Sequence, residues 1–573
     1  MSQERILLEE TFYVLTKKNS VFRVRLTTGG LSLIKESQSH VKEQTIPTKD
    51  IVGCRCLRSK KPTTSCSCQS LPRAGGGLKV VDENSPEQDE TDASTYLYVY
   101  AYVLQNKQNG NSKREKTIIT LRFRSFDKYE ENHKEAQRWR TAIKQLIRGD
   151  NQTEPNADVS IMSRINEQRK LLVICNPKSG PGKGKSIFEE KVAPVLEEAE
   201  IQFEFHLTTH ANHAREFIRT CNVFQWNGVV LVGGDGIVYE VINGMFERPD
   251  WATIAESLPI AVVPGGSGNG LARSVAYYTG EPYVNAPTLP SALSIVRHRC
   301  VPMDLVRVEN SSQIYFSFLS VGWGLLSDVD IESERLRILG GHRFTVWSVA
   351  RLIGLRCYTG KVYYLPGNVQ LGQNDTNGNP VGSGTGSVTD LSESGPRPRI
   401  DSWYSAASKR SAYFSATASS YQSANDSGGD SSVQTKFQMY GPPSQLPCLT
   451  SPLPTSSWVC LEGKFVMVHA SYQSHLGEDC LFAPESKLND GVIWLLIIRG
   501  NVTRTQMLQF LLGLSTGAHA QTSIEGIDFI PVKAFRIEPD MNERGYMTVD
   551  GEHVEYGPIQ AEVCPALSRI MIP

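Results

Sequence analysis

Residues 228–245 read GVVLVGGDGIVYEVINGM, and this stretch decides the fold. A short apolar run, 228–232, has the length of a buried strand and ends in Gly233-Gly234-Asp235-Gly236. After this turn the apolar residues return at helical spacing, so the stretch predicts a strand, a glycine-rich turn and a helix. The glycines permit a close approach of a ligand to the backbone. They leave one carboxylate, Asp235, at the start of the helix, where it could cap the helix or carry out chemistry.

Strands and helices alternate around this stretch, from Lys170 to about Ala276. Further strands are expected at 171–175, 203–207 and 260–263. This alternation predicts a parallel sheet of the α/β class. Ligands of such sheets bind at the carboxyl ends of the strands, so the turns there are the candidate site.

Two of those turns are also rich in small residues. Residues 176–186 read NPKSGPGKGKS, which departs from a P-loop because Ser179 stands where that motif needs glycine. Residues 264–270 read PGGSGNG, and Leu271 replaces the last glycine of a dinucleotide fingerprint. Small residues let backbone N–H groups approach phosphate, and the first turn adds three lysines. Taken alone, each turn could equally be a flexible loop.

The composition is that of a mainly globular chain with several domains. Its 573 residues are 40% hydrophobic and 21% charged, which excludes collagen-like, coiled-coil and wholly disordered proteins. The longest apolar run, 492–498, is too short to cross a bilayer. The N-terminus lacks the basic and then apolar order of a signal peptide. We therefore expect a cytoplasmic protein that associates peripherally with membranes.

The first 150 residues form a basic segment, with 26 Lys and Arg against 18 Asp and Glu. Alternating apolar and polar residues predict strands within 5–52 and 95–125, and Trp139 lies on the apolar face of a helix expected from Glu131 to Gly149. Strands closed by one helix resemble a pleckstrin-homology-like barrel, with 60–94 as a long loop. Because no nucleic-acid-binding motif is present, the positive charge favours an anionic membrane surface and no nucleic acid.

Four cysteines cluster in this segment, at Cys54, Cys56, Cys66 and Cys68. Their C-x-C spacing is tighter than that of a zinc knuckle, so we favour a thiol-bearing loop over a zinc or acylation site and predict no bound metal at these cysteines.

Composition divides the rest of the chain. We expect a polar linker at 151–167, the α/β domain at 168–300 and a β-rich domain made of 301–366 and 458–573. The stretch 367–457 between its halves is rich in Ser, Gly, Asn, Thr and Pro, so we expect a disordered insertion.

The three turns in this order resemble the diacylglycerol-kinase catalytic superfamily. Four further runs narrow the resemblance to sphingosine kinases: 233–244, 247–251, 328–334 and 549–552. The resemblance covers residues 168–365 and 458–573. The resemblance implies an α/β catalytic domain with glycine-rich nucleotide turns and a mostly β lipid-binding domain. It also implies an enzyme that uses ATP and Mg²⁺ to phosphorylate the primary hydroxyl of sphingosine-like bases, giving sphingosine 1-phosphate.

The resemblance further assigns roles to individual residues. Asp235 corresponds to the general base, with Gly233, Gly234 and Gly236 beside the substrate hydroxyl, and Asp330 corresponds to the acid that holds the sphingoid amine. The positions that correspond to nucleotide contacts are Asn176, Pro177, Lys178, Thr208, Thr209, His210, Ala211, Asn212, Glu240, Gly266, Ser267, Gly268, Arg337, Arg343, Asp550, Gly551 and Glu552.

Two rival functions stay open. A ceramide or diacylglycerol kinase would use the same scaffold, but only a free sphingoid amine benefits from a carboxylate at Asp330. A catalytically silent membrane-binding adaptor is disfavoured by the intact Asp235 and the three turns. For Asp328, Glu332 and Glu334 we expect a solvated acidic face for at least two of the three.

The stretch 343–356 places apolar residues at helical spacing between basic ones. Such a face could bind calmodulin or a membrane. We favour the alternative, that it is core or the wall of an acyl-chain channel, and of these we prefer the channel wall.

Overall fold

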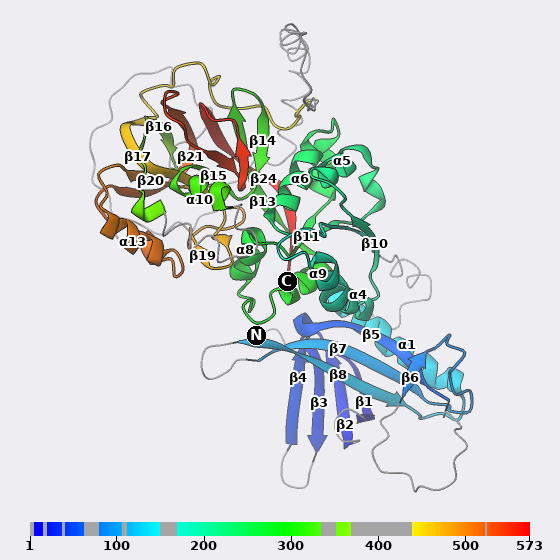
Figure 1. Ribbon diagram of the computed structural model, residues 1–573. Helices are drawn as coiled ribbons and strands as arrows, with labels where there is room; N and C mark the ends of the chain where they lie inside the picture. The colour runs from blue at the N-terminus through cyan, green and yellow to red at the C-terminus, as the bar shows by residue number, and fades with distance from the viewer. Residues whose placement is uncertain are drawn as a thin grey trace.

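The computed structural model describes residues 5–14, 20–36, 41–61, 79–105, 112–148, 169–333, 351–367, 438–521 and 524–573. Figure 1 shows three parts: an N-terminal β unit, an α/β unit above it, and a C-terminal β unit beside the latter. The α/β unit is called the catalytic unit below, after the role that the resemblance implies for its turns. Among the described residues, no helix is both long enough and apolar enough to cross a membrane.

The N-terminal unit is an eight-stranded antiparallel sheet with the order β4-β3-β2-β1-β8-β7-β5-β6. Helix α1 (Tyr129–Arg148) packs on it through Trp139, Ile143 and Leu146, all buried, as the helical spacing predicts. Phe12 meets the Trp139 ring edge-to-face at 5.2 Å. The strands are β1 (Ile6–Val14), β2 (Ser20–Thr27), β3 (Gly30–Glu36), β4 (Val41–Pro47), β5 (Ile51–Ser59), β6 (Val80–Asp82), β7 (Thr95–Gln105) and β8 (Lys113–Phe123).

Two expectations for this unit are wrong. The predicted loop 60–94 contains β6, which pairs with the edge of β5 because its valines extend that sheet. Cys54 and Cys56 lie on β5 in the core and not on a loop, and burial raises the pKa of the Cys54 thiol to about 12. Residues 62–78, with Cys66 and Cys68, lie outside the described part.

The catalytic unit is built on the parallel strand order β10-β9-β11-β12, as the alternating pattern predicts. One face of this sheet carries α5, α6 and α7, and the other carries α4 and α9. Its strands are β9 (Lys170–Cys175), β10 (Gln202–Leu207), β11 (Val229–Gly233) and β12 (Ile260–Pro264). Its helices are α3 (Gly184–Ile187), α4 (Ala193–Glu198), α5 (His213–Thr220), α6 (Asp235–Phe246), α7 (Trp251–Ser257), α8 (Gly270–Thr279) and α9 (Thr288–Arg297).

The C-terminal β unit is continuous with this sheet. Strand β24 pairs in parallel with β12 and antiparallel with β13 and β21, so one 14-stranded sheet spans both units across the boundary expected at 300. Its helices are α10 (Leu325–Ser333) and α13 (Arg504–Gly513). Its strands are β13 (Arg299–Asn310), β14 (Ile314–Ser317), β15 (Ser320–Gly324), β16 (Tyr358–Pro366), β17 (Val459–Ser471), β18 (His475–Gly477), β19 (Cys480–Leu481), β20 (Ile493–Arg499), β21 (Ile527–Pro539), β22 (Met547–Val549), β23 (Glu552–Val554) and β24 (Ile559–Ile572).

The last part of the predicted disordered insertion is ordered. Residues 438–457 lie along the C-terminal β unit, where the carbonyls of Cys448 and Ser451 accept hydrogen bonds from the buried Arg536 guanidinium at 3.1 and 2.7 Å. A buried guanidinium requires such acceptors, so it fixes this polar segment despite its composition. Residues 368–437 lie outside the described part.

The N-terminal unit packs against the catalytic unit on the α4 and α9 side of the sheet (Figure 1). Val52 and Tyr102 join the apolar layer formed there by residues such as Val173, Leu196 and Leu293. The Tyr102 hydroxyl donates to the Glu198 carboxylate at 3.1 Å. The two units therefore share a continuous apolar layer.

Candidate active site

Asp235 is the first residue of α6, and one residue, Gly234, separates it from the end of β11. Its carboxylate accepts hydrogen bonds from the backbone N–H groups of Gly270 at 2.8 Å and Leu271 at 3.2 Å. These are the first two residues of α8, so Asp235 caps a neighbouring helix and not its own. Its own N–H donates to the carbonyl of Gly268 at 3.1 Å. The turns after β11 and β12 are thereby held together.

Burial sets the protonation chemistry of this carboxylate. It raises the pKa of Asp235 to about 6, while the N–H groups of Gly270 and Leu271 act in the opposite direction. A carboxylate with a pKa slightly below neutral is ionised at pH 7 and can still accept a proton in a reaction.

All three small-residue turns meet at this point. The N–H of Gly265 donates to the carbonyl of Gly233 at 2.9 Å, and the N–H of Asn176 donates to that of Val232 at 3.0 Å. A Cβ on Gly266 would lie 2.3 Å from the Cα of Gly234, which explains the glycine there. The prediction that the strand ends bring the turns together is confirmed.

The turn at 208–212 lies at the same edge of the sheet. The N–H of Thr208 donates to the carbonyl of Cys175 at 2.9 Å. Glu240, on α6, accepts from the N–H of Ala214 at 3.0 Å, at the start of α5. Asn176 folds its own turn by accepting from the N–H of Lys178 at 2.9 Å. The predicted nucleotide positions before residue 270 therefore form one connected edge.

The end of the chain returns to this edge. A Cβ on Gly236 would lie 3.2 Å from the Glu552 carboxylate, and one on Gly551 would lie 3.3 Å from that of Asp330. Asp330 is on α10. A series of neighbouring residues therefore leads from the first turns into the C-terminal β unit, in the order Asp235, Gly236, Glu552, Gly551 and Asp330.

Asp550 differs from its neighbours. Its buried carboxylate accepts from the Ser317 hydroxyl at 2.6 Å and from the N–H groups of Phe318, Leu319 and Ser320 at 2.9–3.2 Å. Burial raises its pKa to about 7. The sequence predicts a nucleotide contact for Asp550, whereas here its oxygens hold the turn between β14 and β15. A backbone turn in a dry interior needs those acceptors, so Asp550 is structural.

Asp328 does not belong to a solvated acidic face. This side chain is 1% exposed and accepts from the Tyr358 hydroxyl at 2.6 Å. Burial raises its pKa to about 6. Glu332 forms an ion pair with Arg351, and Glu334, Arg337 and Arg343 lie outside the described residues.

Two residues near Asp235 carry no sequence motif that singles them out. Glu478, in the turn between β18 and β19, accepts from the Asn269 side chain at 2.9 Å and from the Tyr283 hydroxyl at 3.3 Å. Burial and the negative charge of Glu478 raise the pKa of Tyr283, and the charge of Asp235 adds to this effect. Glu478 is separated from Asn269 by more than two hundred positions, so only the fold reveals this contact.

Apolar residues continue from α10 into the C-terminal β unit. Leu325 and Val329, near Asp330 on the same helix, belong to a buried cluster with Phe482, Met507 and Phe510. Leu352 and Leu355 pack against the same cluster, as the core alternative for 343–356 predicts, while 343–350 lies outside the described part. Asp330 therefore sits between the polar edge and an apolar interior.

Comparison with known proteins gives the family. Residues 170–308 match the diacylglycerol kinase catalytic domain, and 459–572 match the YegS C-terminal NAD kinase beta sandwich-like domain. The chain is 31% identical to sphingosine kinase 2 from Homo sapiens, over 92% of this chain and 84% of that protein. It is 34% identical to sphingosine kinase 1 from Homo sapiens, over 69% and 89%.

The chain belongs to the sphingosine kinase family. Sphingosine kinase 1 from Arabidopsis thaliana is 31% identical over 69% of this chain and 70% of the plant protein. Among solved structures, a putative diacylglycerol kinase from Bacillus anthracis is 16% identical, with a TM-score of 0.42 over 71% of this chain and 97% of that one.

Proposed function

We propose that this sphingosine kinase family member transfers the γ-phosphoryl group of ATP to the primary hydroxyl of sphingosine and related sphingoid bases. The observation that carries the proposal is the ionisable, buried Asp235 at the junction of three small-residue turns. Asp235 accepts the hydroxyl proton as the oxygen attacks phosphorus. Backbone N–H groups of the turns, with Lys178 and its neighbours, stabilise the charge on the phosphates.

The nucleotide is proposed to lie along the edge formed by 176–178, 208–212 and 266–268, with Glu240 supporting the second of these turns. Arg337 and Arg343 stay predicted phosphate contacts outside the described residues. Asp330 is proposed to hold the substrate ammonium, since it lies between this edge and the apolar cluster that would face the hydrocarbon chain.

The site fits a magnesium ion that would be held mainly by the phosphates of the substrate ATP. Within the described residues, no group of three or more His, Cys, Asp or Glu could hold a metal alone. Mg²⁺ in kinases keeps water and phosphate ligands and takes only one or two carboxylates, and Glu552 beside Gly236 is the carboxylate we propose. When bound, Mg²⁺ neutralises charge on the phosphates.

A substrate panel tests the proposal. Purified protein is incubated with labelled ATP, Mg²⁺ and sphingosine, ceramide or diacylglycerol, and the phosphorylated lipid is measured. We expect turnover on sphingosine and little on the other two, which lack a free amine. Comparable turnover on ceramide or diacylglycerol would favour those kinase activities, and no turnover on any lipid would favour an adaptor.

We further propose that the N-terminal unit is pleckstrin-homology-like and contributes to binding an anionic membrane. Its positive charge supports this, but Arg114, Lys116, Arg140 and Lys144 pair with carboxylates of the catalytic unit. The free charge is therefore smaller than the sequence suggests. Deleting the unit would also uncover the apolar layer at Val173 and Leu196, so charge reversal of exposed lysines is the better test.

Such a variant carries Lys42→Glu and Lys134→Glu, both at exposed positions of the N-terminal unit. At low salt this variant should sediment less with anionic vesicles than the wild type does. At high salt the two should sediment equally, because salt screens the attraction between exposed charges. If the variant and the wild type sediment equally at low salt as well as at high salt, membrane binding through this unit is contradicted. Calmodulin binding by 343–356 has no such support, since Leu352 and Leu355, both partly buried, already pack against the apolar cluster of Phe482 and Met507.

A further inference from the structure

His469 is a polar residue in an apolar part of the C-terminal β unit. It lies on β17 and is 6% exposed. Met467, two residues earlier and therefore on the same face of the strand, belongs to the buried apolar cluster that contains Phe482. The rings of His469 and Phe482 meet edge-to-face at 5.1 Å. The imidazole of His469 therefore faces this cluster.

Neither ring nitrogen of His469 is paired. Within the part of the chain that the structure describes, no hydrogen bond reaches its Nδ1 or its Nε2, and both atoms are buried. Burial lowers the pKa of His469 to about 3, so the ring is neutral at physiological pH. A neutral imidazole carries one donor and one acceptor, and burying either without a partner costs free energy.

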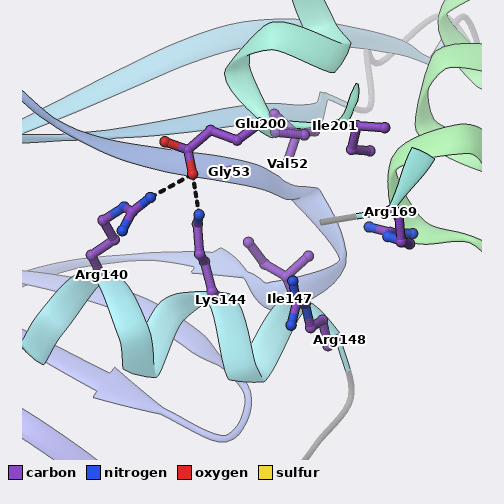
Figure 2. A pocket seen from close by; sticks show the side chains of 10 residues that line it. Val52, Gly53, Arg140, Lys144, Ile147, Arg148, Arg169, Glu200 and Ile201 are labelled. Carbon is purple, nitrogen blue, oxygen red and sulfur yellow. Dashed lines mark hydrogen bonds and ion pairs between the residues drawn. The ribbon is translucent and has the colours of Figure 1, made fainter. Parts of the chain in front are cut away.

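Polar groups inside folded proteins nearly always have partners, and other interior positions of this protein follow that rule. Asp550, in the same β unit, accepts from the Ser317 hydroxyl and from three backbone N–H groups. Glu200 lines a small cavity between the N-terminal and catalytic units, where it accepts from the Arg140 guanidinium at 2.6 Å and pairs with Lys144 (Figure 2). His469 departs from this pattern. A group from a bound molecule would supply its missing bonds.

Three polar atoms converge over Gly322 on β15. A Cβ on this glycine would lie 2.6 Å from Oγ of Ser327, 2.8 Å from Nδ1 of His469 and 3.0 Å from Oγ1 of Thr548. The register explains this, because Gly322 pairs with His469 on one side and with Thr548 on the other, and Ser327 is on α10, which follows β15. The two hydroxyls bond to each other at 2.9 Å. The lack of a side chain at Gly322 thus leaves a polar spot beside an apolar cluster.

This polar spot lies between the two parts of the proposed lipid site. Ser327 precedes Asp330 by three residues on α10, and side chains with this spacing lie about 5–6 Å apart on a helix. On its other side, His469 contacts Phe482 of the apolar cluster. With the ammonium at Asp330 and the hydrocarbon chain against the cluster, the first carbons beyond the amine pass the polar spot.

We propose that His469, with Ser327 and Thr548, binds a hydroxyl group on the chain of the sphingoid base and so makes the enzyme prefer 4-hydroxysphinganine to sphinganine. The inference rests on the proposed function and specifies which sphingoid bases that site selects. A hydroxyl both donates and accepts, as a neutral imidazole does, so one group can pair with His469 and with a neighbouring hydroxyl. A base without this hydroxyl leaves the buried imidazole unpaired, and sites of this kind discriminate strongly against such a ligand.

The test compares kcat/KM of the full chain on sphinganine and on 4-hydroxysphinganine, which differ by one hydroxyl. The wild type should favour 4-hydroxysphinganine. His469→Leu should lower the ratio of the two kcat/KM values by about tenfold or more, because the extra hydroxyl would then face an apolar side chain. His469→Gln keeps a donor and an acceptor and should retain much of the preference.

Val468→Ala is the matched control, because the side chain of this neighbouring core residue belongs to the other apolar cluster of the unit. It should lower the melting temperature and leave the substrate ratio unchanged. A loss of folded protein lowers both rates alike, so the ratio separates specificity from stability. An unchanged ratio in His469→Leu, or a wild type without preference for 4-hydroxysphinganine, would overturn the proposal and leave water as the partner of His469.

Binding of the two bases, followed by tryptophan fluorescence, gives the same ratio without turnover. Failure of the proposed function would appear as absent phosphorylation of both bases, whereas failure of this inference would appear as a binding ratio that His469→Leu does not change.

Discussion

Arg114 of the N-terminal unit and Glu281 of the catalytic unit form a buried, two-pronged ion pair. Nε donates to Oε2 at 2.6 Å and Nη2 to Oε1 at 2.7 Å, with the two side chains 3% and 9% exposed. Nη1 of Arg114 also donates to Asp50 at 2.7 Å. Glu281 follows α8, the helix whose first N–H groups hold Asp235. The N-terminal unit therefore contacts the C-terminal end of α8, the helix whose N-terminal end holds the candidate base Asp235.

Arg114→Ala should strongly destabilise the protein. It removes the cation that Asp50 and Glu281 share and leaves Glu281 only the more distant Arg297, at 3.9 Å; removing one partner of a buried ion pair typically costs about 3–5 kcal/mol. Denaturant unfolding measures the loss, with the exposed Arg124→Ala as control. Glu281→Gln in the Arg114→Ala background should recover part of the stability, because one unpaired charge is removed. Equal stability of Arg114→Ala and the control would show that the pair does not hold the units together.

Asp235→Asn should lower turnover on sphingosine by about 10² or more, the usual effect of losing a positioned base. Nucleotide affinity should change little and the fold should be kept. The amide oxygen can accept from only one of the two N–H groups at the start of α8, so a modest fall in melting temperature is expected. In the wild type, activity should fall as the pH drops through about 6, where the carboxylate is protonated. Turnover near the wild-type level in Asp235→Asn would remove this residue from the mechanism.

Asp330→Asn should weaken sphingosine binding by roughly 2–5 kcal/mol, because the substrate ammonium would lose its partner in a desolvated site. The KM for ATP should stay nearly constant. Any residual activity on ceramide is the internal control, and a loss as large as that for sphingosine would show that Asp330 does not read the amine.

Asp328→Asn tests the burial of that carboxyl group. The folded-state pKa of about 6 lies above the ordinary value of 3.8, so the folded protein holds the proton more tightly than the unfolded chain. The stability that this tighter proton binding gives the folded protein is fully present below the pKa of the unfolded chain. It is lost as the pH rises through the pKa of the folded protein. Asparagine does not titrate. The unfolding free energy of Asp328→Asn relative to wild type should therefore rise by about 3 kcal/mol between acid and neutral pH.

The exposed Asp127→Asn is the matched control for this change and should show no such trend. A relative stability of Asp328→Asn that stays flat with pH would mean that the carboxyl group titrates as it does in the unfolded chain.

Two deletions separate the ordered and the undescribed parts of the polar insertion. Replacing 368–437 by a short Gly-Ser linker should leave melting temperature and activity on dispersed sphingosine nearly unchanged. Extending the deletion through 457 removes the carbonyl acceptors of Arg536 and should lower the melting temperature clearly. If both deletions are equally stable, the contacts of Arg536 contribute little.

The local sequence predicts the parts of this protein that depend on neighbouring residues. The strand, turn and helix around Asp235, the parallel order implied by alternating segments, and the apolar face at Trp139 all follow from short-range spacing. These local patterns are kept in the folded protein because the spacing of apolar residues and the glycine content constrain the backbone, whatever it packs against.

Only the tertiary structure decided how these pieces use their polar groups. Asp235 caps α8 instead of its own helix, Asp550 supports a turn, Asp328 is buried, and 438–457 is ordered by Arg536. In each case the partner comes from a distant part of the chain, and the need to satisfy a buried polar group outweighs local composition. Spacing along a sequence carries no information about such partners.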